Sequence, residues 1–504
     1  MRRFRPFLLV TAMALAGCSA GGPVGAPEAV PPVRASGDEV RLTILHLNDV
    51  YEITPVEGGK AGGLARVGGL LRQLRAENPN TIAVLAGDYL SPSALGTARV
   101  DGERLAGRQM VAVLNAMGLD VAALGNHEFD VSEDAFRQRM IESEFTVISG
   151  NARAARGFAS FEGVDEHTVL TVGPDNIRVG VVSTVLPSTV KDYVQYGDVM
   201  EELAADVRET EGKSEVLIGL THLSFADDVR AAAGIPALDL VLGGHEHENI
   251  RAYRGTDATP ILKADANART VYVHEVRLNR ASGEMTVEST LVPITERTPE
   301  DPAVAAEVAR WVDAAYAGFR EQGFEPDRIV VQLGEPLDGR EGTIRTRPSL
   351  LGTTIADGFR AVSGAEAAVF NGGSVRIDDV LTPGPFSEYD AIRVMPFGGD
   401  VVTVEMPGRL LARLLDQGQT NAGTGGYLQT SGITGASGAW LVNGQPVDPA
   451  RTYTIASNDF LVSGREAGLD WFSVEGNDEI TQTGVFGDVR QAFIAELKKL
   501  YGDG

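Results

Sequence analysis

Five apolar runs in the first half of the chain each end in residues whose side chains ligate metal ions. Such runs, rich in Val, Ile and Leu and bounded by turn residues, are typical of strands buried on both faces. In open α/β sheets, ligands bind outside the carboxyl ends of the strands, so we expect these side chains to converge on one site. Two carboxylates, one amide and several imidazoles suit a pair of divalent transition-type cations. The residues at the five ends are Asp49, Asp88, Asn126 with His127, His222, and His245 with His247.

Taken singly, these residues also have ordinary structural interpretations. Asp88 follows a glycine, which is typical of a turn, and a lone His222 is more often a core histidine. His245 and His247 stand two apart behind two glycines. This spacing favours a loop that aims both inward, because such positions diverge on a helix. Five such ends in one segment favour a shared metal site. Three other histidines fit no motif and are interpreted as structural: His46, His167 and His274.

The elements that must position this site belong to the first of two predicted domains, since 504 residues exceed what one core supports. Residues 41–298 repeat strand, loop and helix. Residues 299–327 have apolar residues at helical spacing and predict a connecting helix, ended by a glycine and a proline. Residues 328–504 combine short β runs with helical stretches at 351–362 and 408–417, and they predict a smaller mixed α/β domain.

The first residues predict export and lipid anchoring. Arg2, Arg3 and Arg5 precede a short apolar stretch that is too short to span a membrane. It ends in Leu-Ala-Gly-Cys at Cys18, the only cysteine, and this resembles the bacterial lipobox. We predict a lipoprotein signal peptide over residues 1–17 and a flexible Gly-, Ala- and Pro-rich tether over 18–40. The protein would be lipid-anchored through Cys18 and face the periplasm, at the outer membrane in a Gram-negative source.

The formal net charge is −25. It argues against a nucleic-acid polymer as partner, because phosphate backbones need a basic surface. A small phosphorylated substrate remains compatible, since metal ions and arginines meet its charge locally. No second apolar stretch is long enough to span a membrane, and the sequence leaves the oligomeric state open.

The motifs resemble those of a known family. NDVY, GDY, GNHEFD, TH and GGHEH resemble the calcineurin-like metallophosphoesterases. In the second half, NGGSVR from Asn371, MPFGG from Met395, GGYLQTSGI and NDFL from Asn458 resemble segments of the 5′-nucleotidase family, which includes UDP-sugar hydrolases and 2′,3′-cyclic-nucleotide phosphodiesterases. The resemblance implies a two-domain α/β fold, in which a metallophosphoesterase β-sandwich flanked by helices precedes a mixed α/β substrate-binding domain.

The resemblance also implies roles for the metal ligands. Asp88 would bridge two divalent ions such as Zn, Mn or Co, and His127, oriented by Asp130, would donate a hydrogen bond to the phosphate or leaving oxygen. The first ion would be held by Asp49, Asp88 and His247, and the second by Asp88, Asn126, His222 and His245.

Tyr51 departs from the family pattern, which usually has D-x-H where this chain has Asp49-Val50-Tyr51. A tyrosine ligates as phenolate, which is costly because its free pKa is about 10. We therefore expect the first site to be the weaker one, and whether Tyr51 ligates metal stays open.

In the second domain, the resemblance implies a substrate grip. Arginine suits bidentate contact with phosphate, and stacking on an aromatic ring contributes about 1–3 kcal/mol per base. Core packing is the alternative for the two phenylalanines. The family's GGDG[FY] segment is replaced here, and Asp470 would stand in for its aspartate at a longer spacing. The implied residues are Arg347, Asn371, Arg376, Phe397, Phe460 and Asp470.

We therefore predict a metal-dependent hydrolase of nucleotides, nucleoside diphosphate sugars or cyclic nucleotides. One alternative is a thiosulfohydrolase of sulfur oxidation, a class that resembles this family in both domains. The other is a non-catalytic surface ligand-binding lipoprotein, which Tyr51 favours and the intact His127 and Asp130 oppose.

Overall fold

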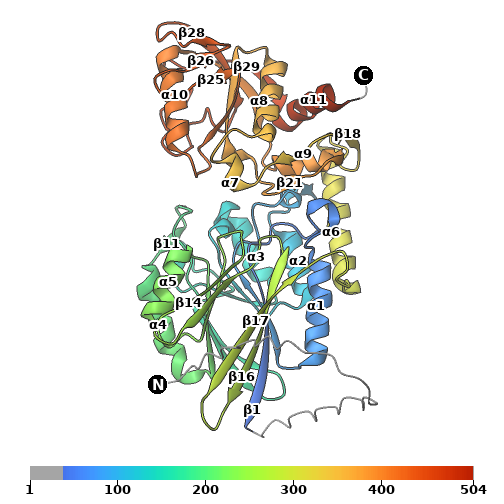
Figure 1. Cartoon of the computed structure of the whole chain (residues 1–504), viewed down its shortest axis with the longest axis vertical. Helices are drawn as coiled ribbons and strands as arrows, with labels where there is room; N and C mark the ends of the chain where they lie inside the picture. Colours follow the sequence, from blue (N-terminus) through green and yellow to red (C-terminus); the bar gives the residue numbers. More distant parts are fainter. Residues whose placement is uncertain (1–37, 503–504) are drawn as a thin grey trace, which may run out of the picture.

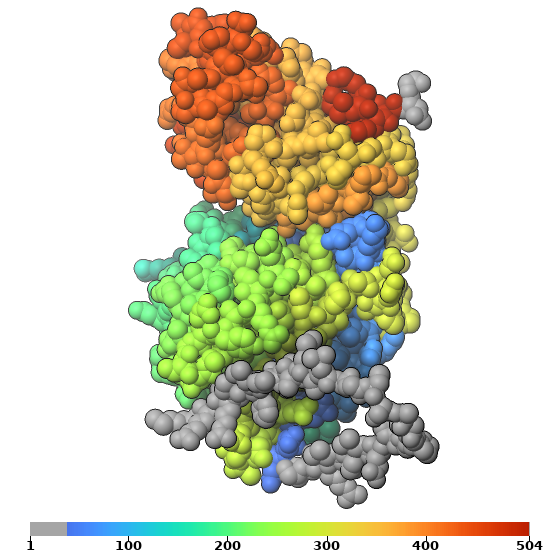
Figure 2. Space-filling model, viewed as in Figure 1, coloured from blue at the N-terminus to red at the C-terminus, as the bar shows by residue number. Residues whose placement is uncertain are grey.

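The computed structural model describes residues 38–502, so the predicted signal peptide, Cys18 and nearly all of the tether lie outside the described residues. The described chain forms two α/β bodies stacked along the long axis (Figure 1). Their surfaces meet in the space-filling view (Figure 2). This confirms the predicted two-domain α/β architecture. Over residues 38–502, none of the helices combines the length and apolar character needed to cross a bilayer.

Two sheets face each other in the N-terminal body. Their inner faces share one hydrophobic core, which includes Ile44, Val84, Ile218 and Leu242. The first sheet runs in the order β17 (Met285–Pro293), β16 (Thr270–Asn279), β1 (Glu39–Leu47), β2 (Thr81–Ala86), β5 (Val121–Ala123), β6 (Thr146–Ile148), β8 (Val164–Asp165). The second runs in the order β14 (Ile250–Arg254), β15 (Thr259–Lys263), β13 (Leu240–Gly243), β12 (Val216–Thr221), β10 (Ile177–Val182), β9 (His167–Val172).

Helices cover the outer faces of this sandwich. Helices α1 (Leu64–Glu77), α2 (Arg108–Met117) and α3 (Glu133–Glu142) share a core with the first sheet. Helices α4 (Val199–Thr210) and α5 (Phe225–Gly234) share one with the second. Because β2 and β12 are covered on both faces, every one of their residues is buried. This explains why their sequences are uninterrupted apolar runs.

The predicted connecting helix is α6 (Pro302–Glu321). The carboxylate of Asp301 caps it by accepting hydrogen bonds from the N–H groups of Ala303 and Val304. Pro302 is the first residue of the helix, where its missing N–H costs no hydrogen bond. The helix packs against α1 and α2 (Figure 1). Its Trp311 and Phe319 are buried in the same core as those helices.

The C-terminal body is built on one mixed sheet. Helices α8 (Leu350–Ser363) and α11 (Val489–Tyr501) share a core with it, and α10 (Gly408–Thr420) packs in a second core. Short elements α7 (Glu341–Ile344), α9 (Glu388–Val394) and β21 (Val380–Leu381) lie on the side facing the N-terminal body (Figure 1). The sheet runs in the order β24 (Leu428–Ser431), β20 (Ala367–Asn371), β28 (Thr452–Asn458), β23 (Asp400–Pro407), β29 (Thr481–Asp488).

Small ladders complete the structure. They are β3 (Arg99–Val100) with β4 (Glu103–Arg104), β7 (Ala152–Ala154) with β11 (Val194–Tyr196), β18 (Ile329–Leu333) with β22 (Gly384–Ser387), β19 (Leu337–Asp338) with β21, and β25 (Ile433–Thr434) with β26 (Leu441–Val442) and β27 (Gln445–Pro446).

The strands that lead to the predicted site are parallel to one another within each sheet. Strand β2 pairs in parallel with β1 and with β5. Strand β12 pairs in parallel with β10 and with β13. Their carboxyl ends therefore lie at one edge of each sheet, and His247 at this edge contacts Asp378 of the C-terminal body.

Candidate active site

The loops after five strands bring the predicted ligands together. Asp49, Asp88 and His245 have φ angles of 52°, 58° and 83°. Few residues other than glycine adopt such left-handed backbone, and it clusters at functional sites. Glycine is required beside them: a Cβ on Gly125 would lie 2.2 Å from Asp88 Oδ1, and one on Gly244 would lie 2.2 Å from Ala86 O. The loops therefore pack more tightly than residues with side chains would allow.

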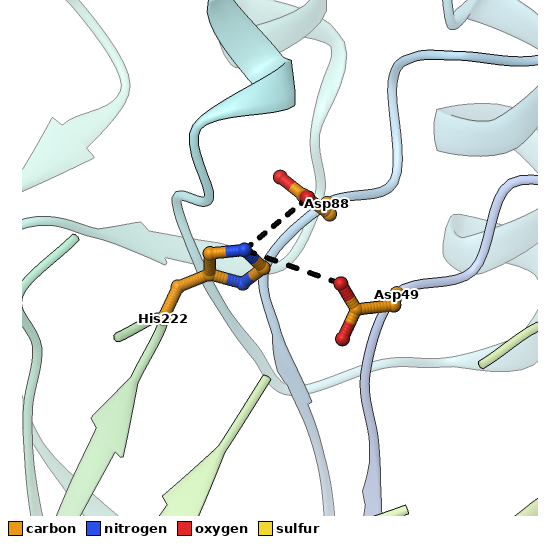
Figure 3. A group of neighbouring side chains, drawn as sticks. All are labelled: Asp49, Asp88 and His222. Atoms are coloured by element: carbon orange, nitrogen blue, oxygen red, sulfur yellow. Dashed lines mark ion pairs between the residues drawn. The ribbon is translucent and has the colours of Figure 1, made fainter. Parts of the chain in front are cut away.

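Asp49, Asp88 and His222 form the centre of the site (Figure 3). His222 Nε2 lies 3.2 Å from Asp88 Oδ2 and 4.0 Å from Asp49 Oδ1. Its Nδ1 donates to Ala86 O at 2.8 Å, which aims Nε2 at the carboxylates. Burial lowers the pKa of His222, but Asp88 outweighs burial and raises it to about 10. Burial likewise raises the pKa of Asp88, yet His222 and His127 hold it well below its ordinary value.

The second set of predicted ligands fits a metal ion. Within residues 38–502, Asn126 Oδ1 is buried and makes no hydrogen bond, whereas His222 Nε2 pairs with Asp88. An unpaired buried polar atom is costly, and both an amide oxygen and an imidazole nitrogen are good donors to a cation. Burial and the nearby His222 lower the pKa of His245, so its imidazole is neutral, as metal binding requires. Asp88 and His222 belong to the group of ligand atoms that lie within 4.8 Å of one another, and Asn126 and His245 would complete a donor set for one divalent ion.

The first set of predicted ligands surrounds the Tyr51 hydroxyl. This oxygen lies 3.3 Å from Asp49 Oδ1, 3.1 Å from Asp88 Oδ2 and 3.1 Å from His247 Nε2. Burial, Asp88 and Asp49 raise the pKa of Tyr51 well above its ordinary value. In the metal-free protein, Tyr51 is therefore a neutral phenol.

His247 is held from the C-terminal body. Its Nδ1 donates to Asp378 Oδ2 at 2.6 Å, which turns Nε2 toward Asp49 Oδ1 at 3.8 Å. Burial lowers the pKa of His247, but the hydrogen bond to Asp378 and the charge of Asp49 outweigh it and raise that pKa to about 9. Asp378 also accepts from Glu341 N at 2.9 Å, and its carbonyl accepts from Arg269 of the N-terminal body at 2.9 Å.

His127 and Asp130 lie beside the ligands in a single turn. His127 Nδ1 lies 2.6 Å from Asp130 Oδ2, and the backbone N–H of His127 donates to Asp88 Oδ1 at 2.8 Å. Arg376 reaches across from the C-terminal body, with Nη2 3.4 Å from His127 Nε2. The predicted dyad and one predicted phosphate-binding arginine are therefore adjacent.

Two arginines at the end of α7 differ in position. Arg347 is exposed, and its side chain makes one long contact, 3.5 Å to Thr343 Oγ1. Arg345 pairs with Glu341 and is largely buried. Burial lowers its pKa, partly offset by Glu341, and Arg376 lowers it further. Sequence reasoning missed Arg345, because the spacing Arg-Thr-Arg does not indicate which side chain turns inward.

Asn371 lies in a network of polar side chains. Its Nδ2 donates to Glu466 Oε2 at 2.9 Å, and its Oδ1 accepts from Ser374 Oγ at 2.7 Å and Asn458 Nδ2 at 3.2 Å. Asp470 is exposed. Glu466, which sequence reasoning did not single out, is thus the carboxylate beside Asn371, and burial raises its pKa.

The two predicted stacking residues differ in exposure. Phe397 is 51% exposed and lines a cavity of about 740 Å³ together with residues of the N-terminal body, including Asp130 and Arg139. Phe460 is half-buried, with the Arg465 guanidinium 5.4 Å from its ring centroid.

A buried lysine supports the histidine loop. Lys263 Nζ donates to Leu223 O and Gly244 O, each at 2.7 Å, and lies 2.7 Å from Asp228 Oδ2. It also pairs with Glu246, between the two ligand histidines. Sequence reasoning missed Lys263, which lies inside an apolar strand, because lysines are almost never fully buried.

The three remaining histidines have structural surroundings. His46 and His274 are fully buried and stack on one another, and burial lowers the pKa of His46 to about 3. His167 Nδ1 lies 3.2 Å from Asp206 Oδ1. His167 and Asp206 thus form a His–Asp pair like that of His127 with Asp130.

Comparisons with known proteins agree with this arrangement. Residues 42–249 match the family model of the calcineurin-like phosphoesterases, and residues 330–473 match that of the 5′-nucleotidase C-terminal domain. A snake venom 5′-nucleotidase from Naja atra is 27% identical over 445 residues, which cover 78% of this chain and 81% of that protein.

Two solved structures share the fold over nearly the whole chain. A 5′-nucleotidase precursor from Thermus thermophilus matches with a TM-score of 0.75 and 23% identity, covering 92% of this chain and 97% of that one. A sulfate thiohydrolase, SoxB, from Thermus thermophilus matches with a TM-score of 0.67 and 15% identity, covering 94% and 96%.

Proposed function

Because the chain belongs to the two-domain 5′-nucleotidase family of calcineurin-like metallophosphoesterases, we propose that it hydrolyses phosphate esters of nucleotides at a centre of two divalent metal ions. The substrate class includes nucleoside 5′-monophosphates, nucleoside diphosphate sugars and 2′,3′-cyclic nucleotides. One observation carries the proposal. Arg376, from the C-terminal body, meets His127 beside the ligands of the N-terminal body. Side chains from both bodies therefore meet beside the predicted metal ligands.

The side chains divide the work of phosphoryl transfer. When bound, the metal ions supply positive charge that polarises a phosphoryl oxygen and orients the substrate. Asp130 accepts the Nδ1–H of His127, so that Nε2 faces the substrate and exchanges a proton with the leaving oxygen. Arg376 donates N–H groups to the phosphate. We assign Arg345 to the same phosphate, because it is the more buried of the two arginines that follow α7. Arg347 is the alternative.

The C-terminal body grips the rest of the substrate. Phe397 and Phe460 stack on the base, in keeping with the exposed ring of Phe397. At Phe460 a cation, Arg465, already lies over the ring. Asn371 and a carboxylate bind the sugar hydroxyls. Glu466 is favoured over Asp470 as that carboxylate, because it already accepts a hydrogen bond from Asn371.

Phosphate release from a substrate panel tests this function. The metal-stripped protein would be reloaded with Zn²⁺, Mn²⁺ or Co²⁺ and given a 5′-monophosphate, a nucleoside diphosphate sugar, a 2′,3′-cyclic nucleotide and p-nitrophenyl phosphate. His127→Ala should lose activity, whereas His167→Ala should keep it, because both remove a histidine from a His–Asp pair and only one pair lies at the ligands. Equal loss in both variants, or no release after reloading, would contradict the proposal.

The two alternatives make different predictions in the same assay. A thiosulfohydrolase would release sulfate from a thiosulfate-bearing substrate and spare the nucleotides. The likeness to SoxB is one of fold alone at 15% identity. A non-catalytic ligand-binding protein would bind nucleotides without turnover at any metal load.

We also propose export and lipid anchoring through Cys18. This rests on the Arg-rich start, the short apolar stretch and the lipobox-like end at the only cysteine. In a bacterial host, the protein should fractionate with membranes and carry lipid by mass spectrometry. Cys18→Ser should release it to the soluble fraction. Membrane association that survives this substitution would contradict the proposal.

A further inference from the structure

The Tyr51 hydroxyl occupies the centre of the first ligand set. Tyr51 is 6% exposed, and its backbone N–H donates to Asn267 Oδ1 at 3.0 Å. The ring lies between two imidazoles, edge-on to His127 at 6.3 Å and tilted against His247 at 5.5 Å between centroids. Backbone and ring contacts therefore hold the hydroxyl in place.

Hydrogen bonding does not account for this position. A phenol has one proton to donate, yet its oxygen lies 3.1–3.3 Å from two carboxylate oxygens and one imidazole nitrogen. The hydroxyl can donate its one proton to only one of the two carboxylate oxygens. The other carboxylate oxygen then faces a lone pair of the phenol oxygen, which is a repulsive contact. A hydroxyl bonded to a carboxylate normally lies closer, at about 2.5–2.7 Å.

The distances from the Tyr51 hydroxyl are instead compatible with an oxygen that shares one cation with these three residues. Oxygen and nitrogen ligands lie about 2.0–2.2 Å from such an ion, so neighbouring ligand atoms are about 2.8–3.6 Å apart in octahedral or tetrahedral sets. The three Tyr51 distances fall in this window. The Asp49 Oδ1 to His247 Nε2 distance, 3.8 Å, is slightly wider.

We infer that Tyr51 is a ligand of the first metal ion, in place of the imidazole usual in the family. This inference rests on the proposed function. Binding of the ion displaces the phenol proton to water and leaves an oxygen–metal bond. The first site then has four protein ligands: Asp49, Tyr51, Asp88 and His247.

This ligand set makes the two sites chemically unequal. The first contains two carboxylates and a phenolate, whereas the second shares Asp88 and otherwise has the neutral ligands Asn126, His222 and His245. Hard anionic oxygens favour hard, highly charged ions. The first site should therefore accept a harder ion than the second, so Fe³⁺ can serve there as a spectroscopic probe in place of a divalent ion.

Spectroscopy and metal counting test the assignment. The stripped full chain would be loaded with Fe³⁺ and then Zn²⁺, and its visible spectrum and metal content measured. A phenolate bound to Fe³⁺ gives a visible charge-transfer band, so wild type should show the band with two ions bound. Tyr51→Phe should lose the band and bind the first ion more than about 100-fold more weakly. This exceeds the loss of affinity of about 10- to 100-fold that is typical when a residue hydrogen-bonded to a ligand is removed. Tyr51→His should bind two ions without the band.

Tyr89→Phe is the matched control. Tyr89 is fully buried one residue after Asp88, and its hydroxyl makes no hydrogen bond within the described residues. It should keep both ions and the band. Bound ions without a band in wild type, or full affinity in Tyr51→Phe, would overturn the Tyr51 assignment and leave the proposed function intact. A wild type that binds no ion would overturn both.

Discussion

Asp378→Asn should weaken metal binding although Asp378 belongs to the other body. The His247 Nδ1 to Asp378 Oδ2 distance of 2.6 Å is short, and the two side chains are 20% and 15% exposed. This bond fixes the tautomer and aims Nε2 at the first site. Loss of such an outer partner typically costs about 10- to 100-fold in metal affinity, or about 1.4–2.8 kcal/mol. Asparagine keeps one oxygen but loses the charge, so we expect the lower end of this range, and the upper end for Asp378→Ala.

Competition with a chromophoric chelator would measure this affinity on the stripped full chain. Asp379→Asn is the matched control, because the neighbouring Asp379 also crosses the interface, accepting from Glu57 N at 3.2 Å, but does not contact His247. Coupling between sites is reciprocal, so a nucleotide analogue that engages the C-terminal body should tighten metal binding in wild type and less so in Asp378→Asn. The reasoning is refuted if Asp378→Asn binds metal like wild type, or if Asp379→Asn loses as much.

Three further predictions follow from the site and its surroundings. His127→Ala should lower kcat by about 10²- to 10⁴-fold with metal content unchanged, as measured by steady-state kinetics and elemental analysis; loss of metal would make His127 a ligand instead. The double variant of Phe397 and Phe460 to alanine should raise KM for nucleotides but spare a small aryl phosphate, and equal loss on both would indicate a core role. Burial raises the pKa of Asp206 to about 6 from its ordinary 3.8, so its stabilising contribution is present below that ordinary value and is lost as the pH rises through about 6. The thermal midpoint of Asp206→Asn, relative to wild type, should therefore rise between pH 4 and pH 7, and a flat or falling difference would count against the shift.

The ends of the buried strands were predictable from sequence for a physical reason. A strand covered on both faces is largely apolar, so the first polar residues after it mark the sheet edge, as Asn48 with Asp49, Asp88 and His222 do. The connecting helix was equally predictable, because its N-cap, its first-turn proline and the spacing of its apolar residues all lie within the helix sequence itself. Its extent, Pro302–Glu321, lies inside the predicted residues 299–327.

The cross-body contacts were not predictable in this way. Asp378 meets His247 across 131 positions of sequence, and nothing local to Asp378 indicates a histidine partner. Arg345 and Arg347 have the same type and nearly the same place, so only the packed structure distinguishes them. The role of Tyr51 depends on distances to the neighbouring Asp49 and to side chains from two other segments. Its residue type alone does not decide whether Tyr51 leaves the first metal site one ligand short or serves as the fourth ligand.

Helix α6 has mechanical consequences for the chain. Val304, Trp311 and Ala315 of this helix are buried in the core of the N-terminal body, and Phe319 also packs on Tyr389 of α9. The helix therefore holds both bodies. Stripping it away would expose large side chains worth about 1.5–3 kcal/mol each, so an N-terminal fragment meant to fold alone must extend past Glu321. Any swivel of the C-terminal body must also break the bonds that tie the following residues to α9, where Glu388 N donates to Arg328 O at 3.0 Å and Tyr389 N to Pro326 O at 3.2 Å. Under a stretching force, these bonds should keep the joint closed until α9 separates from it.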